Sequence, residues 1–165
     1  MADIPPYNQY ILPISVQIQS AFQYWHAHGN IDADCAIDNV GIEWRCYVGK
    51  YDYNYISTPL FVYNSQYDED ALLILGAFQP YDKSELEYRE QYRGEIVNSL
   101  SQENITYAFV PISQEHAISV HPESQTLEIH GESLQDMLGP WFFNLPGIPK
   151  LIQYDYITYA PLVSH

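Results

Sequence analysis

Two polar residues in this sequence, Asp68 and His116, follow apolar runs at positions that could support acid–base chemistry. Asp68 comes soon after the run at residues 60–63, and His116 comes soon after the run at residues 105–110. If both runs are parallel strands, the side chains that follow them gather at one edge of the sheet. A carboxylate can fix the tautomer of an imidazole, whose other nitrogen then deprotonates a serine. We therefore treat Asp68 and His116 as candidates for the acid–base pair of a Ser-Asp-His triad.

Simpler roles are open for both residues, and the third member of a triad has no candidate. An aspartate before a short helix commonly caps that helix, and a histidine in a loop is commonly just solvated. A Gly-x-Ser-x-Gly segment, which holds a nucleophilic serine on a strained turn, does not occur in the sequence. The residues therefore supply at most two of the three triad members.

The spacing of apolar residues predicts the elements that position this pair. A helical period begins at Ile14 and reaches Trp25, with Gly29 as the expected C-cap. Further helices are expected at residues 69–76, at 84–100 behind a capping box formed by Ser84 and Glu87, and at 133–143 behind Ser133. Strands are expected at residues 44–48, 60–63, 105–110 and 127–129, the second of them central and buried. This alternation predicts an α/β fold with a mostly parallel sheet flanked by helices.

The composition excludes several classes of protein. The 165 residues include 21 Asp and Glu against 6 Lys and Arg, which gives a formal net charge of −15. Such a chain lacks the cations that bind nucleic-acid phosphates, and an anionic membrane surface repels it. Its 47% hydrophobic content and 16 tyrosines provide a core, so disorder is not expected. The first residues have no signal-peptide pattern, and no apolar run is long enough to enter a membrane.

The remaining motifs are weak on their own. Cys35 and Cys46 are too few for a Cys-only zinc site, and their spacing permits either free thiols or a disulfide. A glycosylation sequon begins at Asn104 and has meaning only in a secreted protein. Neither the histidines at 26 and 28 nor the carboxylates at 68–70 have the pattern of a metal site, so we expect no metal and no other cofactor.

Five segments, in order along the chain, carry a more specific pattern. They are Ala21-Phe22-Gln23-Tyr24-Trp25, Cys35 with Glu43-Trp44-Arg45-Cys46, Thr58-Pro59-Leu60-Phe61-Val62 with Tyr67-Asp68-Glu69, Tyr107-Ala108-Phe109-Val110 with His116, and Ile129-His130-Gly131-Glu132-Ser133-Leu134. Together they resemble the C-terminal part of the pectinacetylesterase/Notum family of serine carboxylesterases. The resemblance extends over residues 15–143 and leaves residues 1–13 as an irregular arm and residues 144–165 as a Pro- and Tyr-rich tail.

The resemblance implies a partial α/β-hydrolase-like fold in which Asp68 and His116 are the triad acid and base. It also implies a disulfide between Cys35 and Cys46, and hence a secreted ancestry. Tyr47, Val48 and Ile74 are then expected near the acyl-binding pocket, with ordinary core packing as the alternative for all three. The implied substrate is an ester, either an acetylated polysaccharide or an acylated protein.

Departures from the family pattern limit what these residues can do alone. The serine elbow and the oxyanion-hole loop of the family lie upstream of the segments matched here, and Ser113 stands where family members have a cysteine. We therefore expect the C-terminal part of a longer esterase that is inactive by itself. The alternative is a non-catalytic module that binds a glycan or a protein. In either case an unpaired sheet edge could lead to self-association.

Overall fold

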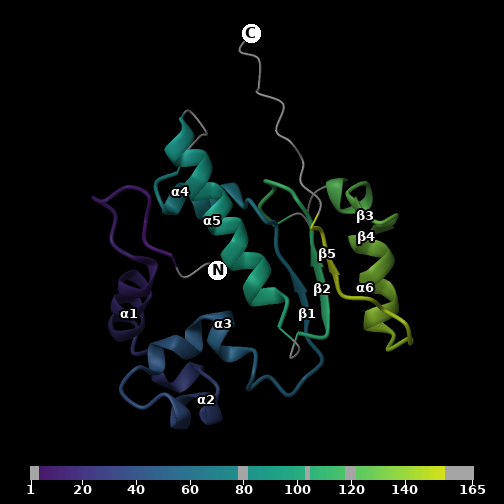
Figure 1. The fold of residues 1–165 in the computed structure, drawn as a ribbon. Helices are drawn as coiled ribbons and strands as arrows, with labels where there is room; N and C mark the ends of the chain where they lie inside the picture. The colour runs from purple at the N-terminus through teal and green to yellow at the C-terminus, as the bar shows by residue number, and fades with distance from the viewer. Residues whose placement is uncertain (1–3, 78–81, 103–104, 118–121, 155–165) are drawn as a thin grey trace.

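A three-stranded parallel sheet forms the centre of the molecule (Figure 1). The computed structural model describes residues 4–77, 82–102, 105–117 and 122–154. Strand β2 (Tyr107–Val110) lies between β1 (Phe61–Tyr63) and β5 (Leu151–Ile152), with Phe61 opposite Tyr107 and Phe109 opposite Leu151. The α/β class with a parallel sheet is therefore confirmed. Among the described residues β1 pairs on one side only, so its predicted central position is wrong and β2 is the central strand.

Alternating side chains of β2 divide the core between the two faces of the sheet. Ala108 and Val110 pack on one face with Tyr92 and Ile96 of α5 (Lys83–Leu100). On the opposite face, Phe109 packs with Leu134 and Met137 of α6 (Leu134–Phe142). Figure 1 shows the sheet between these two helices. The fold is therefore a three-layer arrangement in which both faces of the sheet are covered.

Local capping explains where the long helices begin. Helix α6 follows the short hairpin of β3 (Glu128–Ile129) and β4 (Glu132–Ser133). Ser133 and Asp136 form the capping box of α6, which confirms that predicted start. Helix α5 is capped instead by Asp82, whose carboxylate accepts a hydrogen bond from the backbone of Glu85. The Ser84–Glu87 capping box is therefore wrong, because the helix already begins at Lys83 and both residues lie inside its first turns.

The segment before β1 differs most from expectation. Residues 44–48 are not a strand, because η2 (Glu43–Tyr47) is a 3₁₀ helix that Cys46 ties by a disulfide to Cys35 in α2 (Ala33–Asp38). The first helix, α1 (Ile14–Tyr24), is also shorter than expected. It ends where His26 adopts a left-handed φ of 49°, which leaves Trp25 exposed and places Gly29 in the 3₁₀ helix η1 (Ala27–Asn30). A last short helix, α3 (Gly49–Asp52), lies in the Tyr-rich loop.

The N-terminal residues pack on the helices although they have no regular structure before α1. Ile4 is buried, and the Pro5 carbonyl accepts a hydrogen bond from the Tyr88 hydroxyl at 2.8 Å. The backbone of Tyr7 donates to Leu75 at 2.9 Å, beside the end of α4 (Glu69–Ile74). Residues 4–11 therefore cover one side of α4 and α5 rather than extending into solvent.

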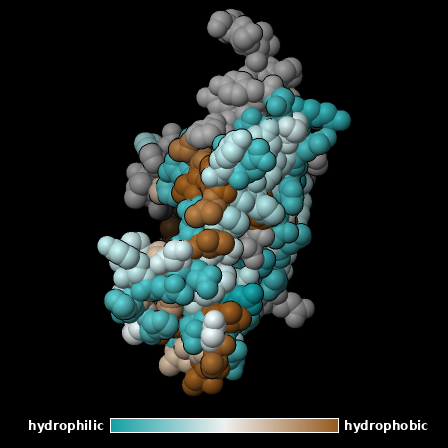
Figure 2. All heavy atoms as spheres, turned by 90° about the vertical axis from the view of Figure 1, so that its left-hand side faces the viewer, coloured by the Kyte–Doolittle hydropathy of each residue, from teal (hydrophilic) through white to brown (hydrophobic). Residues whose placement is uncertain are grey.

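The α1–α3 region has a small core and an apolar surface. Its buried apolar residues are Phe22, Ala27, Cys35, Cys46 and Val48. In Figure 2, hydrophobic side chains gather at the lower end of the visible face. Figure 1 places α2 at this end of the molecule. Ile37 in α2 and Val40 just after it are exposed. With so few buried apolar side chains, the α1–α3 region is expected to depend on its disulfide for stability.

Within the described residues no helix is long and apolar enough to cross a membrane.

Replacing both cysteines by alanine is expected to lower the free energy of unfolding by about 2–3 kcal/mol, because the bond closes a short loop in the unfolded chain. The two residues are 11 positions apart. Chemical denaturation of the Cys35→Ala/Cys46→Ala protein measures the difference, with wild type plus reductant as the matched sample. Equal stability of the oxidised protein and the double variant would contradict the prediction.

Candidate functional site

The chain segments after β1 and β2 stay paired beyond the ends of the strands. Backbone N–H groups of Gln66, Tyr67 and Glu69 donate to the carbonyl oxygens of Pro111, Ser113 and Gln114, each at 3.0 Å. These bonds extend the parallel alignment into two loops that would otherwise diverge. They carry residue 68 and residue 116 to the same edge of the sheet.

A buried glutamine links this edge to the neighbouring strand and helix. Gln66 has no exposed surface, and its amide nitrogen donates to the carbonyls of Val110 at 2.8 Å and Gln153 at 2.7 Å. Its carbonyl accepts a hydrogen bond from the Arg93 side chain on α5 at 2.7 Å. Gln66 was not among the residues predicted from the sequence to belong to the site. Its position, three residues after an apolar strand, is the pattern that could have indicated it. All polar atoms of its side chain are paired, so these hydrogen bonds offset the free-energy cost of burying the amide.

A second set of hydrogen bonds fixes the loop that carries the histidine. The Ser65 hydroxyl donates to the carbonyl oxygen of Glu115 at 2.6 Å and lies 2.6 Å from the Tyr63 hydroxyl. Ser65 is buried, so these bonds are shielded from water. They anchor the residue directly before His116.

Asp68 and His116 are in direct contact. The Nδ1 atom of His116 lies 2.9 Å from Oδ2 and 3.1 Å from Oδ1 of Asp68. Oδ1 of Asp68 also accepts a hydrogen bond from the backbone of Ala71 at 3.0 Å, so Asp68 is the N-cap of α4 as well. The Asp68 side chain is 14% exposed and the His116 side chain 56% exposed. The carboxylate is thus fixed and mostly covered, and the imidazole it orients faces solvent.

A second carboxylate lies on the other side of the imidazole. Oδ2 of Asp70 is 3.9 Å from Nε2 of His116. The hydrogen bond and the charge of Asp68 raise the pKa of His116, partial burial opposes this, and the Asp70 charge adds to it. Because Asp68 occupies Nδ1, the Nε2 atom is the one available to accept a proton from a nucleophile.

The expected pocket residues do not all lie beside this pair. Ile74 is at the end of α4, which begins directly after Asp68, and it is 46% exposed. Tyr47 packs edge-on against Phe22, and Val48 is buried in the α1–α3 region. Figure 1 places α2 and α3 at the opposite end of α5 from α4. The structure thus places Ile74 on the helix that Asp68 begins, and Tyr47 and Val48 in a different part of the fold.

Two other expectations concern modification and metals. Asn104 lies outside the described residues. Among the residues that the structure describes, no cluster of three or more His, Cys, Asp or Glu could hold a metal ion. The contact between Asp68 and His116 is an arrangement at this edge that could do chemistry, as a proton acceptor with its orienting carboxylate.

No family model matches the chain, but Notum from Drosophila matches it both in sequence and in structure. The palmitoleoyl-protein carboxylesterase Notum of Drosophila melanogaster is 24% identical over 139 residues, which are 84% of this chain and 20% of that protein. The chain resembles the Notum/pectinacetylesterase family. Two crystal forms of the Wnt deacylase Notum from Drosophila match with a TM-score of 0.81 and 22% identity. They match 93% and 92% of this chain and 43% of the Notum chain.

The Notum likeness defines the fold and also its extent. The structural match shows that the chain has a Notum-like, α/β-hydrolase-like fold. The chain spans a fifth of the curated relative and less than half of the Notum chain in the crystals. The parallel sheet with helices on both faces is thus part of a larger arrangement in Notum.

Replacing Gln66 by methionine is expected to lower the free energy of unfolding by about 2–4 kcal/mol, because it removes the hydrogen bonds that Gln66 makes with the Val110 carbonyl, the Gln153 carbonyl and the Arg93 side chain. Thermal and chemical unfolding measure the change. The matched control is Gln23→Met, which alters an exposed glutamine on α1. A Gln66→Met protein as stable as the control would show that Gln66 does not hold this edge.

Replacing Asp68 by asparagine is expected to lower the pKa of His116 toward its ordinary value of about 6.5, since it removes the main cause of the increase. Asp70→Asn is expected to lower this pKa by less, because Asp70 acts through its charge alone. An NMR titration of the His116 ring measures both shifts, and Glu69→Gln is the control. An unchanged pKa in Asp68→Asn would contradict the contact.

The same contact makes stability depend on pH in a defined direction. The folded-state pKa of His116 is raised above its unfolded-state value. The pair therefore stabilises the fold fully below the unfolded-state pKa, and this contribution is lost as pH rises through the folded-state pKa. The stability difference between wild type and Asp68→Asn should shrink over that range. A difference that is independent of pH would show that His116 gains no charge stabilisation from Asp68.

Proposed function

We propose that this chain supplies the acid–base pair of a carboxylic ester hydrolase, with His116 as the base and Asp68 as the residue that orients it. The contact of 2.9 Å between Nδ1 of His116 and Oδ2 of Asp68 carries the proposal. The Notum-like fold supports it, because the pair follows two adjacent parallel strands at their carboxyl ends.

The proposed reaction uses the free nitrogen of His116. Nε2 accepts the proton of a serine hydroxyl while the serine oxygen attacks the ester carbonyl, and Asp68 stabilises the imidazolium that forms. His116 then returns this proton to the departing alcohol, which leaves an acyl-enzyme. A water molecule, deprotonated by the same nitrogen, then attacks the acyl carbon, and His116 returns that proton to the serine oxygen as the bond to serine breaks and the acid leaves.

The nucleophile in this proposal comes from outside the 165 residues. The sequence has no Gly-x-Ser-x-Gly segment, so we assign the serine and the oxyanion hole to a segment that is not among these residues. Donors of an oxyanion hole alone are worth roughly 10²–10³ in rate. The 165-residue chain by itself is therefore inactive in this proposal.

The proposed substrate is an acyl ester on a protein or an acetyl ester on a polysaccharide. The names of the relatives, a palmitoleoyl-protein carboxylesterase and a Wnt deacylase, support the first. Within the proposed acyl pocket Ile74 has the strongest support, since it is half-exposed on the helix that begins after Asp68. Tyr47 and Val48 would contribute only if the acyl chain extends toward the α1–α3 region.

The proposed location is extracellular. The disulfide between Cys35 and Cys46 supports it, because such bonds persist in oxidising compartments. In that compartment Asn104 of the sequon would be a glycan acceptor.

The second candidate is a non-catalytic module that binds a glycan or a protein. The lack of a serine elbow in these residues favours it. Strand β1 also pairs on only one side among the described residues, so this edge could accept a strand from another segment or from a second copy. In that role the contact between Asp68 and His116 is structural, through the cap of α4.

In the protein that carries this chain, His116→Ala is expected to lower kcat/KM for p-nitrophenyl acetate by about 10³-fold or more, because the serine loses its base. His130→Asn is the matched control, since it changes an exposed histidine whose φ of 55° asparagine tolerates. Full activity of His116→Ala would contradict the catalytic role and favour the non-catalytic module.

The isolated 165-residue chain is expected to show no turnover above the buffer rate in the same assay. Turnover by this chain that His116→Ala abolishes would contradict the assignment of the nucleophile to another segment.

A further inference from the structure

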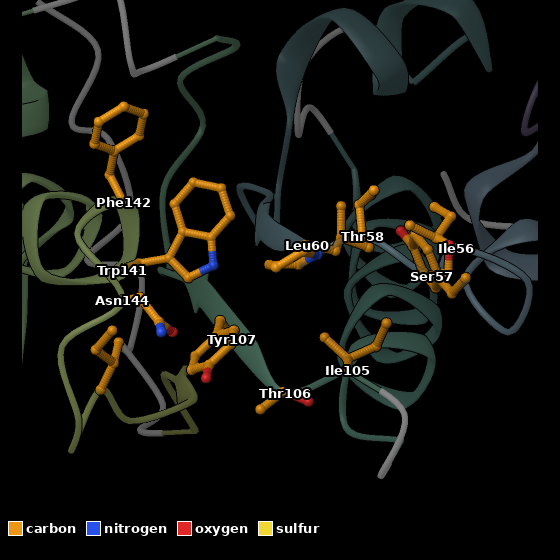
Figure 3. Close-up of a pocket in the computed structure, with 13 residues that line it drawn as sticks. Ile56, Ser57, Thr58, Leu60, Ile105, Thr106, Tyr107, Trp141, Phe142 and Asn144 are labelled. Carbon is orange, nitrogen blue, oxygen red and sulfur yellow. The ribbon is translucent and has the colours of Figure 1, made fainter.

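A cavity of about 670 Å³ opens at the end of the sheet opposite to Asp68 and His116. Its walls come from the residues just before β1, the start of β2, the end of α6 and the loop that follows α6 (Figure 3). Asp68 and His116 follow the carboxyl ends of the same strands, so the length of the sheet separates the two places. The cavity volume lies within the range of roughly 300–1,000 Å³ that is typical of small-molecule sites.

None of the described residues that line the cavity carries a formal charge, although the chain has a net charge of −15. The wall combines aromatic side chains with short hydroxyl and amide side chains, and Figure 3 shows Asn144 beside Trp141. The aromatic members are Tyr53, Tyr107, Trp141 and Phe142, and the polar members are Ser57, Thr58, Thr106 and Asn144. A neutral wall does not discriminate between cations and anions, and it favours a ligand that is itself neutral.

Trp141 provides the most specific feature of the wall. Its indole ring is held edge-on against Phe61, with the ring centres 5.7 Å apart. The indole Nε1 is buried and has no hydrogen-bond partner among the described residues. Figure 3 shows this nitrogen on the side of the ring that faces Leu60 and Tyr107. This nitrogen has almost no accessible surface, so a ligand oxygen can pair with it only after a neighbouring side chain shifts, and the hydrogen bond then offsets the cost of the unpaired N–H.

We propose that this cavity binds a neutral saccharide. The C–H faces of a sugar ring pack on aromatic side chains, and its hydroxyl and ring oxygens pair with hydroxyl, amide and indole groups. An anionic sugar finds no cation among the lining residues, and an acyl chain would leave the side chains of Thr58, Thr106 and Asn144 unpaired. The site is independent of the proposed ester hydrolysis, because no lining residue belongs to the acid–base pair.

The test follows the indole N–H signals of the ¹⁵N-labelled 165-residue chain during titration with saccharides. The chain has three tryptophans, Trp25, Trp44 and Trp141, so the signals are few and substitution assigns them. The neutral probes are cellotetraose, xylotetraose and triacetylchitotriose. Trigalacturonic acid is the anionic probe, and 1-hexanol is the apolar probe. We expect a neutral saccharide to shift the Trp141 signal in a saturable way and to leave the Trp25 signal unchanged.

Two variants locate the binding site. Trp141→Phe is expected to abolish binding of that saccharide in isothermal titration calorimetry, while Trp25→Phe, which changes an exposed ring on the other side of the fold, retains it. Thr106→Val keeps the shape of an exposed side chain and removes its hydroxyl. It is expected to weaken binding about fivefold, the worth of one hydrogen bond. This second variant keeps the test valid if Trp141→Phe fails to fold.

Three results would overturn the proposal. The first is a Trp141 signal that no neutral saccharide moves up to its solubility limit. The second is a stronger response to trigalacturonic acid or 1-hexanol than to any neutral saccharide. The third is saccharide binding that is unchanged in Thr106→Val and also unchanged in a folded Trp141→Phe. None of these results bears on the esterase assay, so the two proposals fail separately.

Discussion

The arrangement at the carboxyl edge of the sheet depends on three backbone hydrogen bonds that continue the pairing of β1 and β2 into their following loops. They join Gln66 to Pro111, Tyr67 to Ser113 and Glu69 to Gln114. Without them the loops would have no common direction, and a contact between Asp68 and His116 across 48 positions would be entropically costly. The buried side-chain amide of Gln66 supports the same alignment, because it donates hydrogen bonds to the carbonyls of Val110 and Gln153. The acid–base contact is therefore a consequence of strand register.

The two ends of the sheet differ in their chemistry. At the carboxyl ends, Asp68 and Asp70 flank His116, so this end concentrates titratable groups. At the amino ends, the described residues that line the cavity around Trp141 are all uncharged. One end is therefore suited to proton transfer and the other to recognition of a neutral ligand. In α/β proteins ligand sites lie at the carboxyl ends of the strands, which is where Asp68 and His116 lie, so the cavity at the amino ends rests on its own lining residues.

The sequence predicted those parts of the fold that local patterns determine. The apolar runs at residues 60–63 and 105–110 and the cap at Ser133 are signals within a few residues, and they placed β1, β2 and α6. Asp68 and His116 became candidates only because they follow those strands. The short helices α2 and α3 contain too few residues to show a period, and the pattern at 44–48 could not show that a disulfide replaces strand pairing there. Strand β5 and the role of Gln66 depend on distant partners, Val110 above all, which spacing along the chain does not show.

Residue-resolved amide hydrogen exchange tests most directly whether register creates the site. If strand register creates the site, the amides of Gln66, Tyr67 and Glu69 exchange as slowly as those of the β2 strand, because they donate to carbonyls across the loops. The amide of Ser113, which lies on the acceptor side of the same loops, is the internal comparison. Exchange at Gln66, Tyr67 and Glu69 as rapid as that of exposed loop amides would show that register does not hold the two loops together.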